Sequence, residues 1–477
     1  MSTEPLIKDG RIIAEANTEL TPEKSAILGV SLGTFLMRSL DRYGTVITGR
    51  DSRNDCRMLK RSFIAGLMSA GFDVMDFHEA PAPMVHFAVR RFGTDCGAMF
   101  SSSHYSPGNV SIKLYDSAGI EFSVEKLREV ARIYENLEKV SRASPSEIGK
   151  ISVIEQARNV YANALKKFVD SKMIKEKKLS VVVDCALGPS SLMLPALLSE
   201  LNCDVIALNS YTPGIHQTKY FLPNIKSFQI LSQTVTTYGA DLGVAYDSDA
   251  DRAIFADEKG NLIEPDDILI LFALSEIARY GGKKKTGNLT TSSTVVVSET
   301  TTKRIDEILE KQGIRVYRAS LLPGEISNSI RKNRAMLGGT DQGGFIWPSF
   351  SHEYDGMLAT INMLEILAKT QKLLSKLVKK VSQPVISGTI IKGKPKTWEE
   401  AISELMKQYP KRCIDTLLGV KILDETGKGW VRIKPALKEK AYILTAESKD
   451  KETAQKILDI MIEKIKCSLC VCENDQQ

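Results

Sequence analysis

The strongest constraint on the fold of this 477-residue chain is a strand–helix–strand pattern that occurs three times. In the first unit, a β-rich run at 44–48 precedes a helical segment that carries Leu59 and Phe63 on one face. Gly71 closes this helix, and a second apolar run begins at 72–75. A strand, a helix and a strand in so short a span favour a right-handed crossover between parallel strands. The pattern therefore predicts an α/β domain with a mainly parallel sheet.

Two further segments repeat this order. In each, a β-rich run precedes a helix-like segment and another apolar run follows it: 179–184, 192–201 and 204–208 form the second unit, and 294–297, 301–312 and 314–317 form the third. After Leu364 the composition changes to a lysine-rich helix and then to an extended strand at 385–391. We therefore expect the last domain boundary near Lys372. At roughly 150 residues per domain, the length agrees with three or four domains.

The charge balance excludes some classes of protein. Lys plus Arg number 64 and Asp plus Glu number 58, so a net charge of +6 is spread over a surface of mixed sign. This balance argues against a nucleic-acid binder. The small positive excess suits an anionic small substrate, although a merely soluble surface has the same charge.

The sequence also indicates a cytoplasmic protein. Its first 13 residues are charged and lack the apolar core of a secretory signal. The longest strongly apolar stretch, at 268–274, is far shorter than the roughly 20 residues that span a bilayer, so we expect no membrane partner. Eight cysteines without framework spacing are typical of a reducing compartment. Cys467, Cys470 and Cys472 form either an incomplete zinc site or part of a flexible tail.

A loop with three alternating aspartates is the most specific local signal. Asp247, Asp249 and Asp251 follow a β-rich run at 241–244 and precede an apolar run at 253–256. Carboxylates at alternate positions of a tight loop can converge on one hard divalent cation, and magnesium is the natural candidate.

Two other interpretations compete with magnesium. An EF-hand would explain Glu258, which lies at the twelfth position counted from Asp247. Arg252 stands at the sixth position, however, where the calcium loop needs glycine, and a strand-like segment follows where a helix should begin. A solvated acidic turn is the third interpretation, and repulsion among three aspartates without a cation argues against it.

A serine-rich turn at 101–103 is the second signal. It follows a β-rich run at 97–100 and continues through His104 to Pro107. By itself, such a turn usually only hydrogen-bonds its own backbone. Lys113 lies downstream, and a nucleophile in a loop with a nearby cation is what phosphoryl transfer through an enzyme-bound phosphate requires.

Together, these motifs resemble those of the α-D-phosphohexomutases, the family of phosphomannomutases, phosphoglucomutases and phosphoglucosamine mutases. The family's nucleophile loop, Thr-Ala-Ser-His-Asn-Pro, aligns with 101–106 and continues to Asn-Gly-Ile-Lys at 110–113. The metal loop Asp-x-Asp-x-Asp-Arg matches 247–252, and the turn Gly-Arg-Asp-x-Arg matches 49–53. The resemblance covers roughly residues 20–364 and is weaker beyond them.

The resemblance implies a four-domain architecture, with three similar α/β domains that have mixed sheets and a C-terminal α+β domain. Domain I, at 1–150, would carry the phosphoserine loop. Domain II, at 151–258, would carry the metal loop, and domain III, at 259–372, the sugar-binding loop. Domain IV would occupy 373–477.

It also implies a phosphosugar mutase that interconverts a sugar 1-phosphate and a 6-phosphate through a bisphosphate intermediate. Ser103 aligns with the phosphoserine, and together with Asp247, Asp249 and Asp251 it would hold one Mg²⁺ per chain. A sugar bisphosphate would serve as activator.

Three further residues receive roles from the resemblance. His104 and Arg252 would hold phosphate oxygens. Lys113 would act as the acid or base.

The chain departs from the family in the loops that bind the substrate. The sugar-binding loop Gly-Gly-Glu-x-Ser-Gly-His corresponds to 338–344, where Thr340 stands in place of the glutamate. Asp341 could still accept hydrogen bonds from sugar hydroxyls, and Gln342 keeps an amide. These three residues are therefore the candidates for sugar binding.

The distal phosphate loop and the amino-terminal loop also differ from the family pattern. The phosphate loop Arg-x-Ser-Gly-Thr-Glu-Pro corresponds to 434–440, which has neither a hydroxyl group nor a glycine. Lys434, Lys438 and Lys440 could supply positive charge there, as point charges without a shaped cradle. The family's amino-terminal Gly-Thr-x-Gly-x-Arg-Gly loop is not recognisable before Leu20.

These departures leave three functional interpretations. The first is a mutase that acts on an altered phosphosugar. The second is a non-catalytic or regulatory paralogue that binds a sugar phosphate or a partner subunit, as a homo-oligomer or a hetero-oligomer with a related mutase chain. The third is a phosphatase-like protein in which water discharges the phosphoserine. Because the metal loop and Lys113 are both retained, we favour the mutase.

Overall fold

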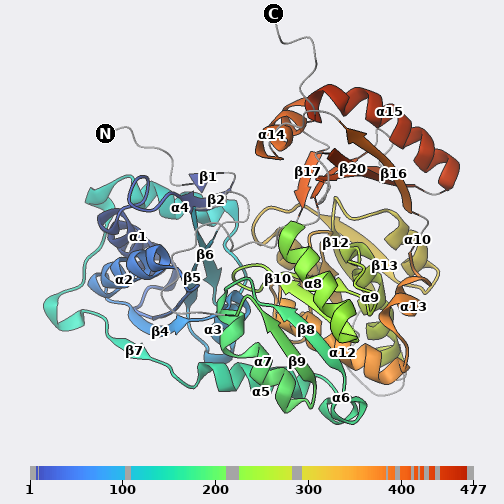
Figure 1. The fold of residues 1–477 in the computed structure, drawn as a ribbon. Helices are drawn as coiled ribbons and strands as arrows, with labels where there is room; N and C mark the ends of the chain where they lie inside the picture. The colour runs from blue at the N-terminus through green and yellow to red at the C-terminus, as the bar shows by residue number, and fades with distance from the viewer. Residues whose placement is uncertain are drawn as a thin grey trace, which may run out of the picture.

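The computed structural model describes residues 7–469 except positions 9, 103–108, 211–224, 282–292, 383–384, 393–397, 410–412, 417–418, 424–428, 436–440 and 449. Its strands form four sheets of seven, four, four and five strands, one in each of four successive domains (Figure 1). Three of these sheets contain parallel pairs, and the last is antiparallel throughout. The four-domain α/β architecture is therefore confirmed.

Domain I contains a mixed sheet with the strand order β1-β2-β6-β5-β3-β4-β7. Its strands are β1 (Ile7–Lys8), β2 (Arg11–Ala14), β3 (Thr45–Arg50), β4 (Asp73–Glu79), β5 (Cys96–Ser102), β6 (Val110–Asp116) and β7 (Ile151–Val153). Its helices are α1 (Pro22–Leu40), α2 (Asn54–Ser69), α3 (Ala82–Phe92) and α4 (Val124–Tyr134), with 3-10 turns at Leu137–Lys139 and Pro145–Glu147. β7 lies beyond the expected boundary at residue 150 but pairs with β4, so the first sheet extends to Val153.

Local sequence sets the ends of helix α1. The hydroxyl group of Thr21 accepts a hydrogen bond from the backbone N–H of Lys24, and Pro22 stands at the first helical position, where its missing N–H is harmless. Asp41 ends the helix in the left-handed conformation. The predicted unit that follows, a strand, a helix and a parallel strand, is present as β3, α2 and β4.

Domains II and III have four-stranded mixed sheets with the orders β11-β10-β8-β9 and β13-β12-β14-β15. The strands of domain II are β8 (Ser180–Asp184), β9 (Asp204–Leu208), β10 (Leu242–Tyr246) and β11 (Ala253–Ala256), with helices α5 (Ala157–Phe168), α6 (Ser171–Lys177), α7 (Leu194–Glu200) and α8 (Ile225–Tyr238) and a 3-10 turn at Pro189–Leu192. Domain III consists of α9 (Pro265–Gly281), β12 (Thr294–Ser298), α10 (Arg304–Glu310), β13 (Arg315–Ala319), α11 (Glu325–Asn333), β14 (Leu337–Gly339), β15 (Phe345–Ile346), α12 (Gly356–Thr370) and α13 (Leu374–Val378). The second and third predicted units are confirmed.

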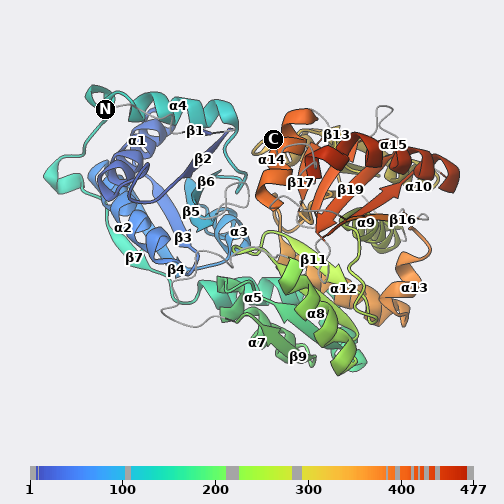
Figure 2. The ribbon, with the colours of Figure 1, turned by 45° about the horizontal axis from the view of Figure 1, so that its top comes forward.

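Domain IV is an α+β domain that packs near domain III (Figure 2). Its antiparallel sheet has the order β16-β20-β19-β18-β17, formed by β16 (Val385–Lys392), β17 (Cys413–Thr416), β18 (Gly419–Leu423), β19 (Trp430–Pro435) and β20 (Ala441–Glu447). Helices α14 (Trp398–Gln408) and α15 (Lys451–Leu469) complete the domain, which has an apolar core of its own. In the described part of the chain, no helix is both long enough and apolar enough to cross a membrane.

A single apolar core runs through domains I, II and III. Phe87 of α3 stacks on Phe350 of domain III with ring centroids 4.9 Å apart, and Tyr161 of α5 packs against both rings. Such close packing restricts relative movement of these domains and so fixes the positions of the loops between them.

The prediction of one lysine-rich helix after Leu364 is wrong. Helix α12 ends at Thr370, because Gln371 adopts a left-handed conformation and its N–H donates to the carbonyl of Leu367. A separate short helix, α13, begins at Leu374. The lysines of this region therefore lie on two helices and the turn between them.

Candidate active site

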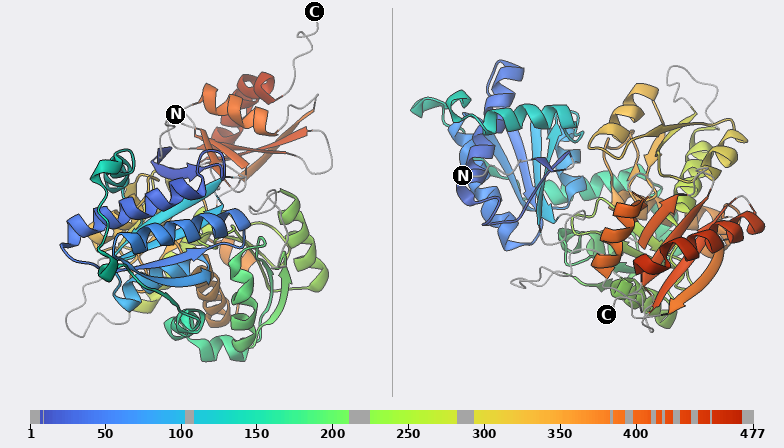
Figure 3. Two further views of the ribbon diagram at one scale, coloured as in Figure 1. Left: turned by 90° about the vertical axis from the view of Figure 1, so that its left-hand side faces the viewer. Right: turned by 90° about the horizontal axis from the view of Figure 1, so that it is seen from above.

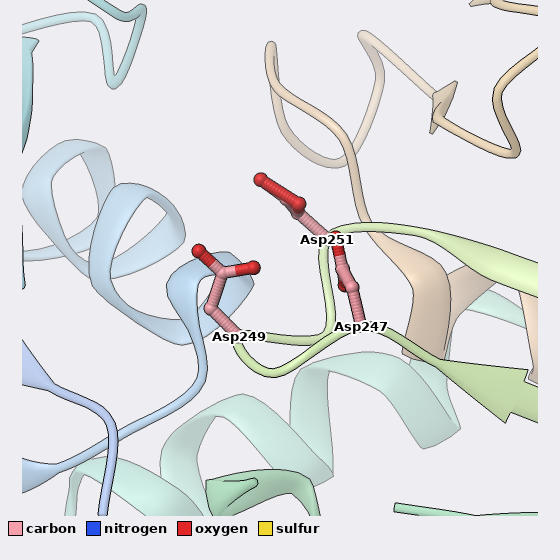
Figure 4. Close-up of side chains that lie close together, drawn as sticks. All are labelled: Asp247, Asp249 and Asp251. Atoms are coloured by element: carbon pink, nitrogen blue, oxygen red, sulfur yellow. The ribbon is translucent and has the colours of Figure 1, made fainter. Parts of the chain in front are cut away.

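The metal loop joins β10 to the antiparallel strand β11 at one edge of the domain II sheet. Ala250 adopts a left-handed conformation and its N–H donates to the carbonyl of Asp247, which turns the chain tightly. Carboxylate oxygens of Asp247, Asp249 and Asp251 consequently lie within 4.8 Å of one another (Figure 4). The predicted convergence of these three side chains is present in the structure.

The electrostatics of this cluster fit a divalent cation. All three carboxylates are buried. Burial raises the pKa of Asp247 and Asp249, and repulsion from Asp251 raises both further. The Oδ1 atom of Asp251 is buried and has no hydrogen-bond partner among the described residues. A hard cation with oxygen ligands would offset the charge and give this oxygen a partner, so the residues present fit Mg²⁺.

The two competing interpretations of the loop do not agree with the geometry. The segment after Arg252 is strand β11, and the carboxylate of Glu258 accepts hydrogen bonds from the backbone N–H and the hydroxyl group of Ser375. Glu258 therefore does not complete an EF-hand. A solvated acidic turn is also excluded, because the three aspartates are at most 8% exposed.

Strands β5 and β6 of domain I bring two polar side chains to the metal loop. Lys113 donates to Oδ2 of Asp249 at 2.8 Å and also to Oδ2 of Asp251. The hydroxyl group of Ser101 donates to the same oxygen of Asp249 at 2.7 Å. Burial lowers the pKa of Lys113, but the two carboxylates outweigh it and hold that pKa well above its ordinary value. Lys113 is thus a cation placed beside the candidate metal ligands.

The turn after β3 holds the residues that flank the serine loop. Asp51 accepts a hydrogen bond from the backbone N–H of Ser102 at 2.9 Å, and Arg53 donates to the carbonyl of Asn109 at 3.0 Å. Burial raises the pKa of Asp51 to about 6, against the opposing charge of Arg53. This turn, which matches the family motif at 49–53, therefore contacts the residues at both ends of the serine loop.

Two of the predicted catalytic residues, Ser103 and His104, lie outside the described residues. Their flanking residue Ser102 ends strand β5, one residue after Ser101, which is bonded to Asp249. The roles of Ser103 and His104 therefore stay predictions.

Arg252 connects the metal loop to the predicted sugar-binding loop. Its backbone N–H donates to Oδ1 of Asp247 at 3.1 Å, and its guanidinium group donates to the side-chain oxygen of Gln342. Its backbone also forms a β-bridge with Gly344. The two loops predicted from separate motifs are therefore in direct contact.

The side chains of the predicted sugar-binding loop point into the protein. Asp341 accepts hydrogen bonds from the hydroxyl groups of Ser298 and Thr300, and its other oxygen accepts from Lys421 of domain IV at 3.0 Å. The hydroxyl group of Thr340 accepts hydrogen bonds from backbone N–H groups of its own loop. Both residues are about 2% exposed. Their predicted contact with sugar is untested, and this conformation does not present either side chain to solvent.

The structure describes little of the predicted phosphate loop. Lys434 belongs to strand β19, but its side chain lies outside the described part of the structure. Lys438 and Lys440 lie outside the described residues altogether. Their proposed charge contribution stays a prediction.

A cavity between domains I and III contains residues that the sequence analysis did not select. Lys113, Asp251 and Arg252 line it together with Arg11, Glu121, Ser327 and Glu353. Arg11 of β2 donates to the carbonyl of Leu321, across the boundary between the two domains. Arg11 could have been noticed in the sequence, because it is the one charged residue of the otherwise apolar strand β2. No sequence motif marked Glu121 or Glu353.

Comparison with known proteins settles the family. The models of phosphoglucomutase/phosphomannomutase α/β/α domains I, II and III match residues 7–141, 159–260 and 264–385. The chain belongs to the phosphoglucomutase/phosphomannomutase family. It is therefore a phosphohexomutase-type isomerase that acts on a sugar phosphate, and the earlier resemblance is confirmed.

Individual relatives of this phosphohexomutase are similar over nearly their whole length. A phosphoglucomutase/phosphomannomutase from Thermococcus kodakarensis is 32% identical over 456 residues, which cover 95% of this chain and 97% of the relative. A probable phosphoglucosamine mutase from Methanosarcina acetivorans is 32% identical over 453 residues and covers 93% and 96%. The crystal structure of a phosphoglucomutase/phosphomannomutase family protein from Burkholderia thailandensis has a TM-score of 0.72, with 18% identity and 96% coverage of each chain.

Proposed function

We propose that this phosphohexomutase interconverts a sugar 1-phosphate and the corresponding 6-phosphate through phosphorylated Ser103 and a sugar bisphosphate. The observation that carries the proposal is the hydrogen bond between Ser101 and Asp249, because it places the end of the strand that leads to Ser103 on the metal loop. Lys113 contacts the same carboxylate from the next strand. The proposal is thus supported by the approach of Lys113 and of the strand before the proposed nucleophile loop to a candidate metal ligand in a second domain.

The proposed reaction consists of two phosphoryl transfers. In the first, the P–O bond to Ser103 breaks as a P–O bond to the free sugar hydroxyl forms, and the hydroxyl proton leaves to a base. The Ser103 oxygen takes up a proton as its phosphoryl group leaves. After the bisphosphate reorients, the P–O bond between the sugar and its other phosphoryl group breaks as a P–O bond to Ser103 forms, the serine proton leaves to a base and the sugar oxygen takes up a proton. In this proposal Lys113 holds or releases that proton and Arg252 holds a phosphate oxygen, and both residues line one cavity.

Asp247, Asp249 and Asp251 would hold Mg²⁺, with Ser103 as a further ligand. When bound, the ion neutralises negative charge that develops on the transferred group. We also propose that a sugar bisphosphate activates the enzyme by phosphorylating Ser103 and that the protein acts in the cytoplasm. The described cysteines, which form no disulfides, agree with a reducing compartment. Association with a second mutase chain stays a prediction, to be checked by light scattering.

Intact-mass analysis tests the proposal directly. Incubation with Mg²⁺ and hexose 1,6-bisphosphates should add one phosphoryl group to the wild-type protein and to Ser102→Ala, and none to Ser103→Ala. A sugar monophosphate that is a substrate should discharge it. A folded, Mg²⁺-binding protein that no bisphosphate phosphorylates would contradict the mechanism. Continuous release of inorganic phosphate would indicate hydrolysis instead.

A further inference from the structure

The family resemblance predicts a glutamate in the sugar-binding loop, and the loop of this chain contributes no carboxylate to the cavity between domains I and III. Thr340 stands at that position, and Asp341 uses both of its oxygens for contacts with Ser298, Thr300 and Lys421. Among the described residues that line the cavity, none belongs to the loop at 338–344. The space inside the cavity is about 30 Å³, which admits a polar group on the edge of a sugar ring but not the ring itself, so that group needs its contacts from other residues.

Glu353 brings a carboxyl group to the cavity from the segment between β15 and α12. One of its oxygens, Oε1, accepts hydrogen bonds from the backbone N–H of Glu121 at 2.9 Å and from the hydroxyl group of Ser327 at 2.8 Å. No described residue donates to the other oxygen, Oε2. The side chain is thus held in place through one oxygen and has the second available for a ligand.

The residues next to Glu353 are also held in place. Both ring nitrogens of the buried His86 are engaged, one with the hydroxyl group of Ser351 at 2.8 Å and one with the carbonyl of Tyr354 at 3.1 Å. Asp355 caps helix α12 by accepting from the N–H of Leu358. Contacts on both sides of Glu353 therefore preorganise its carboxyl group, as ligand recognition requires.

The surroundings of Glu353 favour a hydrogen-bond donor. Burial raises the pKa of Glu353 to about 8, and the nearby charge of Glu121 adds to the effect. The three cations that line the same cavity among the described residues already have acidic or polar partners: Arg11 contacts the carbonyl of Leu321, Lys113 contacts Asp249 and Asp251, and Arg252 contacts Gln342. The carboxyl group of the free protein therefore keeps its proton up to about pH 8, and a ligand that donates an O–H or N–H hydrogen bond to it would favour its ionised form.

We propose that Glu353 is a specificity-determining residue that binds the sugar ring and takes over the function of the carboxylate missing at Thr340. Its Oε2 accepts a hydrogen bond from a donor on the ring, either a hydroxyl group or the amino group of an amino sugar phosphate. The proposal rests on the mutase function proposed above. It places sugar recognition beside Lys113 and Arg252, which line the same cavity.

Steady-state kinetics with Glu353→Gln test this role. The glutamine keeps an oxygen for Glu121 and Ser327, so the fold is preserved, but an NH₂ group replaces the accepting Oε2. We expect KM for the preferred sugar phosphate to rise up to about ten-fold with a smaller change in kcat, since the NH₂ group cannot accept the hydrogen bond from the ring. The exposed Glu307→Gln in the same domain is the control and should match the wild type. Melting temperature and Mg²⁺ affinity should also match.

Substrate analogues identify the donor. The panel is glucose 1-phosphate, mannose 1-phosphate, glucosamine 1-phosphate and the monodeoxy glucose 1-phosphates. If the donor is a hydroxyl group, one deoxy analogue should lose about as much activity with the wild type as Glu353→Gln loses, and lose nothing further with the variant. If it is an amino group, a preference for glucosamine 1-phosphate should disappear in the variant.

The outcomes separate this inference from the proposed function. A wild-type enzyme that converts a sugar phosphate, together with a Glu353→Gln variant of unchanged kcat/KM or without coupling to any analogue, would overturn the role of Glu353 alone. A wild-type enzyme that isomerises no sugar phosphate of the panel would overturn both.

Discussion

Asp355 is a buried carboxyl group at the junction of domains II and III. It accepts hydrogen bonds from the hydroxyl group of Tyr161 at 2.7 Å and from the N–H of Leu358 at 2.8 Å, and it is 1% exposed. Burial outweighs these contacts and raises its pKa from an ordinary value of 3.8 to about 7. The folded state therefore retains a proton that the unfolded chain releases.

This difference predicts a specific dependence of stability on pH. The stabilisation from protonated Asp355 is fully present below pH 3.8 and is lost as the pH rises to about 7. Asp355→Asn keeps one oxygen for the helix cap, places an NH₂ group that can donate to the hydroxyl oxygen of Tyr161, and cannot ionise. The stability of the wild type relative to this variant should fall by up to about 1.4 kcal/mol per pH unit within that window and be constant above it. Urea unfolding at pH 4.5–8 measures the effect.

A matched control separates this effect from the titration of other groups. Glu310→Gln removes an exposed acid of the same domain, and its free energy of unfolding should change with pH as that of the wild type does. If the free energy of unfolding of Asp355→Asn followed the same pH dependence as that of the wild type, the raised pKa of Asp355 would be contradicted.

At the level of single residues, sequence proximity decided what could be predicted. The three aspartates lie within five positions, so their spacing alone indicated a cation site. Glu353 and Lys113 are far apart in sequence and line one cavity only because domains I and III meet there. The ion pair between Asp341 and Lys421 joins two domains and has no sequence signature either.

Helices α1 and α2 pack with their backbones almost in contact. A Cβ atom on Gly66 would lie 2.0 Å from the carbonyl oxygen of Ala26, and one on Gly29 would lie 2.1 Å from that of Phe63. This approach explains two glycines in helix interiors, where alanine has the higher intrinsic propensity by about 1 kcal/mol.

Gly66→Ala should consequently destabilise the protein despite the gain in helix propensity. Overpacking of this kind costs about 1–3 kcal/mol, and the clash is with backbone, which cannot rotate away. Denaturant unfolding measures the change. Arg61→Ala on the exposed surface of α2 is the control and should stay within about 0.5 kcal/mol of the wild type. If Gly66→Ala were more stable than the wild type, α1 and α2 could move apart at little cost in free energy.

Apolar periodicity predicted the strand–helix–strand unit of each α/β domain, because its strands and helix bury one regular set of side chains. It failed after Leu364, where lysines at helical spacing suggested one continuous helix. The helix ends because Gln371 adopts a left-handed conformation and because Leu374 and Leu377 are buried. The spacing of the lysines indicates neither feature.

The contacts among domains I, II and III differ in kind from those between domains III and IV. Domains I to III share one apolar core, whereas charged residues connect domain IV to domain III. The helices and strands of domain IV lie beside those of domain III (Figure 3). Lys421 has a fully buried side chain that contacts Asp341 and Asp266, and Arg432 pairs with Glu264. Buried ion pairs need precise geometry to offset desolvation, so they favour one docked position of domain IV.

Lys421→Met should therefore release domain IV while its own core stays folded. The variant leaves Asp341 and Asp266 buried without this cation, a loss of roughly 3–5 kcal/mol. Hydrogen exchange should increase at β18 and β14, and the radius of gyration from small-angle X-ray scattering should rise. Adding Asp341→Asn removes one uncompensated charge and should restore part of the stability. If Lys421→Met left both measurements unchanged, apolar contacts would have to hold domain IV in place, and Asp341 would be available to the sugar without any movement of that domain.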